Sequence, residues 1–122
     1  MYKVLVCDDE KDIVSAISIY LTSDGYEVIP ARNGLEALDI VKHNDVHLVL
    51  MDIMMPVMDG MTATRAIRSF ARADAKTIPI IAMTANAFDE DAKKCMEAGM
   101  NAHLTKPIEI DRVIEALGQS CR

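Results

Sequence analysis

The sequence predicts an α/β fold in which a five-stranded parallel sheet carries helices on both faces. Five short apolar runs alternate with five segments of helical periodicity from one end of the chain to the other. No linker, internal repeat or low-complexity tract interrupts this alternation over the 122 residues, a length that suits one compact domain.

The strands are expected where the apolar runs are short and rich in β-branched residues, as in strands buried on both faces. KVLVC, near the start of the chain, is bounded by acidic residues and predicts the first strand. The five expected strands are 3–7, 26–29, 47–51, 78–83 and 102–104, with Pro79 early in the fourth.

The helices are expected where apolar residues recur every three or four positions and so share one face. The expected helices are 12–24, 35–43, 59–72, 87–98 and 109–118. In the first, the inward stripe is Ile13, Ala16, Ile17, Tyr20 and Leu21. Gly25 and Gly99 follow the first and fourth helices as stop signals. Right-handed crossovers then leave only a few ways to wind the sheet.

Composition excludes several classes of function. A formal charge of −6 and a pI near 4.9 argue against binding to nucleic acid or to an anionic membrane surface. No apolar run is long enough for a membrane span, and acidic residues come too early for a secretory signal. Cys7, Cys95 and Cys121 are widely spaced, which favours ordinary thiols over a disulfide or zinc site. We therefore expect a cytoplasmic protein.

Polar residues follow the predicted strands where ligands bind in open α/β sheets. They are Asp8, Asp9 and Glu10 after the first strand, Asp52 after the third, Thr84 at the end of the fourth, and Lys106 and Pro107 after the fifth. If the first and third strands are neighbours, three Asp carboxylates converge. Such carboxylates repel one another, which favours a hard cation such as Mg²⁺ among them. Asp52 could then attack a phosphorus centre, with Thr84 and Lys106 contacting the phosphoryl oxygens.

Four stretches carry a resemblance to a known family: VLVCDDE, LVLMDIMMPVMDG, IPIIAMTANA and HLTKPI. In order and spacing they resemble the receiver domains of two-component response regulators, and the resemblance covers essentially all of residues 1–122 as one receiver domain without an output domain. The MTANA and AGMNAHLTKPIE stretches are most similar to receivers of hybrid sensor histidine kinases. The resemblance implies a flavodoxin-like (βα)5 fold with strand order 2-1-3-4-5.

The resemblance also implies roles at the metal site. Asp52 would accept the phosphoryl group, and Asp9 and Asp52 would bind Mg²⁺ directly, with Mn²⁺ able to substitute. Asp8 would act largely through water, and the backbone carbonyl of Met54 would be a further ligand. Gly60 would permit the loop conformation that opens the third helix.

Three further residues are implied to respond to phosphorylation. Thr84 would move toward the phosphoryl group and Lys106 would contact it, with a cis peptide between Lys106 and Pro107. The usual switch aromatic is replaced by His103, which is either a partly buried packing residue or a switch sensitive to pH.

The implied partners are proteins. The phosphodonor would be a sensor histidine kinase or a histidine phosphotransfer protein. A downstream effector would bind the face made by the fourth helix, fifth strand and fifth helix. The domain would be a signalling switch rather than an enzyme, assisting only its own phosphorylation and dephosphorylation.

Other interpretations stay open at this point. A metal-dependent phosphatase with an aspartyl intermediate usually has a second acid two residues after the nucleophile, where this chain has Met54. A flavodoxin-like electron carrier would need a Ser/Thr-rich phosphate loop in place of DDEKD. A docking module without phosphorylation is the third, although every acid and the lysine are present.

Overall fold

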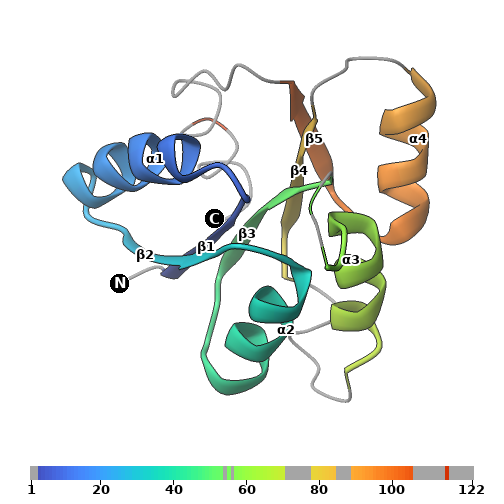
Figure 1. Ribbon diagram of the computed structural model, residues 1–122, viewed down its shortest axis with the longest axis horizontal. Coiled ribbons are helices and arrows are strands. Elements are labelled where there is room, and N and C mark those ends of the chain that lie inside the picture. Colours follow the sequence, from blue (N-terminus) through green and yellow to red (C-terminus); the bar gives the residue numbers. More distant parts are fainter. Residues whose placement is uncertain are drawn as a thin grey trace.

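The fold consists of a twisted parallel sheet with helices on its two sides (Figure 1). The computed structural model describes residues 3–53, 55, 57–70, 78–84, 89–105 and 115. Its strands are β1 (Lys3–Cys7), β2 (Glu27–Ala31), β3 (Leu48–Asp52), β4 (Ile80–Thr84) and β5 (Ala102–Thr105). Its helices are α1 (Lys11–Ser23), α2 (Gly34–His43), α3 (Gly60–Arg68) and α4 (Asp89–Ala98).

The strand order is β2-β1-β3-β4-β5 with every pair parallel, which confirms the predicted fold class. Parallel neighbours along the chain need a crossover, and a helix supplies it each time. Of the predicted fifth helix, only Glu115 is described, and it is helical.

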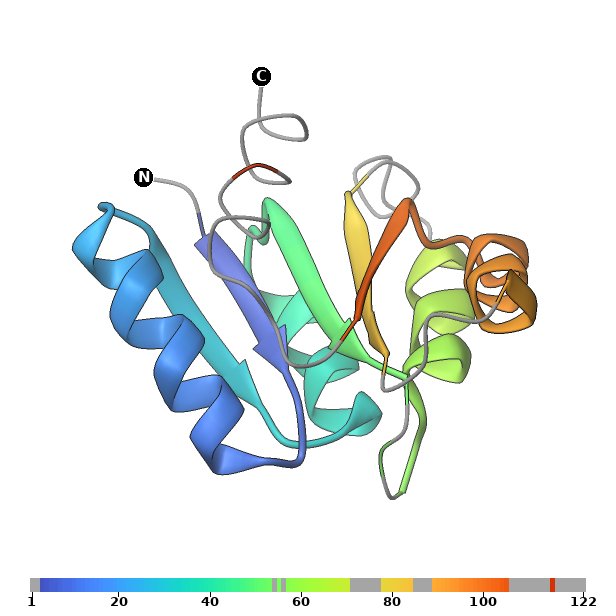
Figure 2. The same ribbon diagram turned by 90° about the horizontal axis from the view of Figure 1, so that it is seen from above.

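Two apolar layers hold the helices to the sheet, one on each face. Alternate residues of β1 point to opposite faces. Val4 and Val6 pack with Ile17 and Leu21 of α1, whereas Leu5 and Cys7 belong to the layer that α2 and α3 cover. The view from above shows α1 on one side of the sheet, with α2 and α3 on the other (Figure 2). β3 and β4 are buried along their whole length, as their continuous apolar runs predict.

The helix ends follow local chemistry. Asn33 caps α2 by accepting a hydrogen bond from the Glu36 amide at 3.0 Å, and Asp59 caps α3 by accepting one from the Thr62 amide at 2.8 Å. Gly25 and Gly99 adopt left-handed φ values of 91° and 106°, so both predicted stop signals are confirmed.

The predictions for Tyr20, Ala16 and Pro79 were wrong. Tyr20 is 54% exposed and Ala16 is exposed, because α1 turns a narrower stripe inward than the periodicity predicts. Pro79 precedes β4 instead of lying within it, and its carbonyl accepts a hydrogen bond from the Val49 amide at 2.9 Å.

The edge strand β2 contains an exposed proline, Pro30, opposite Val6. Among the described residues, no helix has the length and apolar character needed to cross a membrane.

Candidate functional site

The ends of β1 and β3 bring two buried carboxylates to the same edge of the sheet. Cys7 pairs with Met51 in the parallel register, so Asp8 and Asp52 come next on adjacent strands. Only 1% of Asp8 and 3% of Asp52 is exposed. Because buried carboxylates are costly without compensating charge or hydrogen bonds, this pair marks the edge as a candidate site.

Asp8, Asp9 and Glu10 form an acidic cluster beside this pair. One carboxylate oxygen from each lies within 4.8 Å of the others. Asp8 Oδ1 also accepts a hydrogen bond from the Glu10 amide at 2.9 Å, which orients the buried carboxylate. Several oxygen ligands at this separation suit a hard divalent cation, so the residues present fit the metal that the sequence predicts. The sequence had placed Glu10 at this strand end without assigning it a role.

Thr84 lies at the same edge, one strand farther along. It ends β4, is 1% exposed, and follows Met83, which pairs with Asp52. The Ile53 amide donates to the Met83 carbonyl at 3.3 Å, which joins the chain after Asp52 to β4. The structure therefore brings Asp8, Asp9, Asp52 and Thr84 to one edge, as the sequence predicts.

The pKa of the Cys7 thiol is raised by burial and by the nearby acids. Burial, and then the negative charges of Asp52 and Asp8, raise the pKa of the Cys7 thiol from 9.0 to about 12. The thiol therefore stays protonated, and its Sγ lies within hydrogen-bonding distance of two acceptors, the Asn33 carbonyl at 3.3 Å and Met55 Sδ at 3.4 Å. Cys7 thus connects β1 to the two loops that flank the site.

Gly60 contributes through space rather than through an unusual backbone conformation. Its φ is not in the left-handed region, which corrects the expected role. A Cβ at this position would collide with the backbone carbonyl of Asp52 and lie 2.8 Å from Met51 Cγ. Gly60 therefore lets α3 begin directly against the end of β3.

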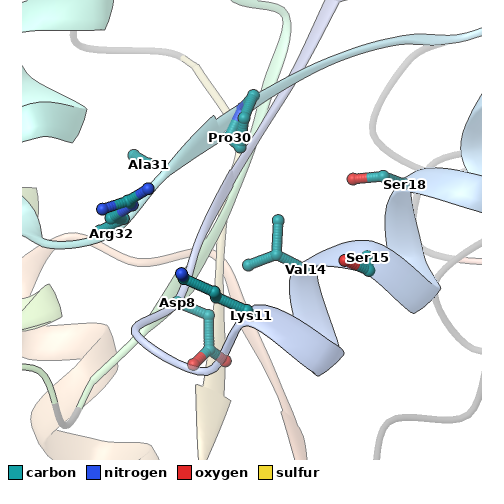
Figure 3. A pocket seen from close by; sticks show the side chains of 8 residues that line it. All are labelled: Asp8, Lys11, Val14, Ser15, Ser18, Pro30, Ala31 and Arg32. Atoms are coloured by element: carbon teal, nitrogen blue, oxygen red, sulfur yellow. The ribbon is translucent and has the colours of Figure 1, made fainter.

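A groove of about 410 Å³ opens beside Asp8, between the start of α1 and the end of β2 (Figure 3). Its lining includes two cationic side chains, Lys11 and Arg32, and two hydroxyls, Ser15 and Ser18. These groups place positive charge and hydrogen-bond donors next to the buried carboxylate of Asp8.

Not every predicted residue belongs to the described part of the chain. Met54, Lys106 and Pro107, and with them the expected cis peptide, lie outside it. His103 lies on β5 opposite Ala82, and its side chain is exposed. The interpretation of His103 as a partly buried packing residue is therefore wrong.

Comparison with known proteins gives the site a context. The family model of the response regulator receiver domain matches residues 4–118. The chain is 36% identical over 114 residues to the sensor histidine kinase RcsC of Escherichia coli, a match covering 93% of this chain and 12% of the kinase. It is 33% identical over 114 residues to the polar-differentiation response regulator DivK of Brucella anthropi, covering 93% of this chain and 91% of DivK. The chain thus spans a small part of the kinase relative and nearly all of DivK.

Solved structures agree with these sequence matches. The receiver domain of a sensor histidine kinase from Pseudomonas aeruginosa has a TM-score of 0.88 and 34% identity, covering 98% of this chain and 96% of that one. That domain has a magnesium ion coordinated in its active-site cleft. The chemotaxis protein CheY4 of Vibrio cholerae has a TM-score of 0.91 and 30% identity, with 98% of each chain covered.

Proposed function

This chain belongs to the family of response regulator receiver domains of two-component systems, and from that premise we propose that Asp52 accepts its phosphoryl group. The observation that carries the proposal is the burial of Asp52 beside Asp8 at adjacent strand ends, next to the acidic cluster. Family members act as phosphorylation switches. We propose that this one assists only its own phosphorylation and dephosphorylation.

We propose that the carboxylates at this edge of the sheet, those of Asp8, Asp9 and Asp52, hold Mg²⁺, for which Mn²⁺ can substitute. Asp9 and Asp52 are assigned as direct ligands, Asp8 as a ligand through water, and the Met54 carbonyl as a backbone ligand. The oriented carboxylate of Asp8 and the close oxygens of the cluster support this donor set. When bound, the ion offsets negative charge on the phosphoryl group and on the acids.

Asp52 is proposed to act as the nucleophile toward a phosphohistidine. A carboxylate oxygen of Asp52 forms a bond to phosphorus while the bond from phosphorus to the imidazole nitrogen breaks. The bonding electrons stay on the imidazole, which takes a proton from solvent. No other co-reactant is needed, because the phosphoryl group only changes its carrier.

The phosphoryl group is then proposed to act on Thr84 and Lys106. The Thr84 hydroxyl donates to one phosphoryl oxygen, and the Lys106 ammonium pairs with another. Thr84 ends the buried strand β4, next to β5, so its movement can alter that edge of the sheet. His103 is proposed as the switch residue there, and its exposed side chain on β5 supports a role at the surface.

The proposed partners are a histidine kinase or histidine phosphotransfer protein as donor, and a protein effector at the face of the fourth helix, fifth strand and fifth helix. We assign the whole chain, 1–122, to one receiver domain. A reducing compartment such as the cytoplasm is proposed because Cys7 and Cys95 are buried cysteines outside any disulfide. A flavodoxin-like carrier is disfavoured, because the acids after β1 would repel a flavin phosphate.

The test uses acetyl phosphate as a small phosphodonor. The wild-type chain should gain one phosphoryl group in intact mass in the presence of Mg²⁺, and EDTA should prevent it. Asp52→Asn should abolish the base-labile adduct. Asp45→Asn is the matched control, since it removes an exposed acid just before β3, at the other end of the strand. An adduct that persists in Asp52→Asn refutes the assignment of the phosphoacceptor.

A further inference from the structure

The first turn of α2 touches the loop that joins β3 to α3. The Gly34 amide donates to the Met58 carbonyl at 3.0 Å. Gly34 is buried, and Met58 lies two residues before the close approach of Gly60 to Asp52. This contact connects α2 to the segment that leaves the proposed phosphoacceptor.

The fit at Gly34 leaves no room for a side chain. A Cβ at this position would lie 2.7 Å from Met58 O, 2.8 Å from Met58 Cγ and 2.9 Å from Met58 Cβ. The Met58 side chain could rotate away, but its carbonyl is part of the loop backbone. A side chain at residue 34 must therefore move the loop, the helix start, or both.

The loop needs such external contacts because its own conformation is unfavourable. Val57 has a φ of 69°, which is strained for a β-branched residue, and its side chain is 74% exposed. Little burial of Val57 compensates for that strain. Described contacts that hold the loop include those of Gly34 with Met58, Cys7 with Met55, and the Asp59 cap of α3. The Gly60 amide also donates to the Ile53 carbonyl at 3.4 Å, and Met55 and Met58 pack against the core.

We propose that Gly34 is a positioning residue for the Asp52 site. By admitting the loop at contact distance, Gly34 fixes Met58 close to the start of α3, where Gly60 lies against the backbone of Asp52. The proposal rests on the proposed function of Asp52, since the loop matters to chemistry only if that edge holds the ion.

Hydrogen exchange of the wild-type chain provides one test. If opening of the contact disrupts ion binding, saturating Mg²⁺ should slow exchange of the Gly34 amide, by up to about a hundredfold at a hundred times the dissociation constant. The Tyr26 amide, bonded to the Leu21 carbonyl at 3.0 Å beyond the far end of α1, is the internal control. Slowing at Gly34 at least tenfold greater than at Tyr26 supports the proposal; equal slowing overturns it.

A pair of glycine variants provides the second test. Gly34→Ala should weaken Mg²⁺ binding by about tenfold in calorimetric titration, as loss of a supporting contact typically does. Gly25→Ala is the matched control, because it strains a left-handed glycine with nothing within 4 Å of the new Cβ. It should lower the melting temperature without changing Mg²⁺ affinity.

The outcomes separate the two proposals. Wild-type affinity in Gly34→Ala overturns the positioning role alone. A wild-type chain that neither binds Mg²⁺ nor forms the Asp52 adduct overturns the proposed function itself. If Gly34→Ala does not fold, the exchange experiment on the wild-type chain decides.

Discussion

The loop after β3 and the turn between α4 and β5 use the same left-handed backbone conformation in opposite ways. At the α4–β5 turn the residue is Gly99, with a φ of 106°, and the conformation costs little. In the β3–α3 loop it is Val57, a residue type that strongly avoids this region. The difference teaches that local preference and backbone geometry agree at the end of α4 and conflict in the loop that follows Asp52, as is common near functional sites.

The same contrast holds for side chains. Arg68 of α3 donates through Nε and Nη2 to the Gly99 carbonyl at 3.0 and 2.9 Å, and through Nη2 to Asn101 Oδ1 at 2.9 Å. Asn101 Oδ1 also accepts from the Ile80 amide at 2.9 Å, so this junction is held by well-matched groups. Beside Asp52, by contrast, a thiol is buried among carboxylates.

The largest expected effect is a loss of stability at high pH that comes from the buried thiol of Cys7. The folded chain keeps the Cys7 proton up to a pKa of about 12, whereas an unfolded thiol releases it near 9.0. Between these values the unfolded state binds fewer protons, so Cys7 should lower the free energy of unfolding by about 1.4 kcal/mol per pH unit as pH rises. This loss should be absent below pH 9.

Urea unfolding of the wild type and Cys7→Val between pH 8 and 11 measures this effect. Valine has a similar volume and no proton to lose. The wild type should lose stability more steeply than the variant above pH 9. Parallel pH profiles would contradict the buried, protonated thiol.

The next effect would break the agreement at the α4–β5 turn. Arg68→Ala should lower the free energy of unfolding by about 2 kcal/mol, because it removes charge-assisted hydrogen bonds to the Gly99 carbonyl and Asn101. Arg65→Ala, at an exposed position of the same helix, is the control and should change stability by less than about 0.5 kcal/mol. Similar denaturation midpoints for the two variants would show that the contacts of Arg68 contribute little.

The smallest effect would relieve the conflict at Val57. Val57→Asn should raise the free energy of unfolding by about 1 kcal/mol, because Asn tolerates the left-handed region far better than Val. Val57→Ile keeps the β-branch and should give no increase. Because the loop is fixed at its ends, acetyl phosphate should phosphorylate Val57→Asn as fast as the wild type. A slower reaction would assign the strain itself a role.

The fold was predictable because its signals are local. The continuous apolar run of β3 and the stop signals Gly25 and Gly99 each depend on a few neighbouring residues, and the structure confirms them. The placement of Asp8, Asp52 and Thr84 followed as soon as the strand ends were located, since parallel strands end at one edge. The detailed roles of these residues stay predictions.

The remaining features depend on contacts between distant segments. The need for glycine at residue 34 arises from the contact between α2 and Met58. The apolar periodicity of α2 does not indicate that contact. The exposure of Tyr20 depends on how much of the α1 surface the sheet covers, which a stripe of apolar residues does not specify. Val57 shows no sequence signal, because its conformation contradicts its own preference.

Pro30 affects whether the sheets of neighbouring copies of this domain can pair edge to edge. A sheet edge can recruit a strand from a neighbouring molecule when its free amides are regularly spaced. β2 forms one edge of this sheet, and the ring of Pro30 removes a donor from it close to the end of the strand. Copies of the domain held at high local concentration should therefore resist pairing of their sheets through β2. Any association between copies along this edge should depend on side-chain contacts.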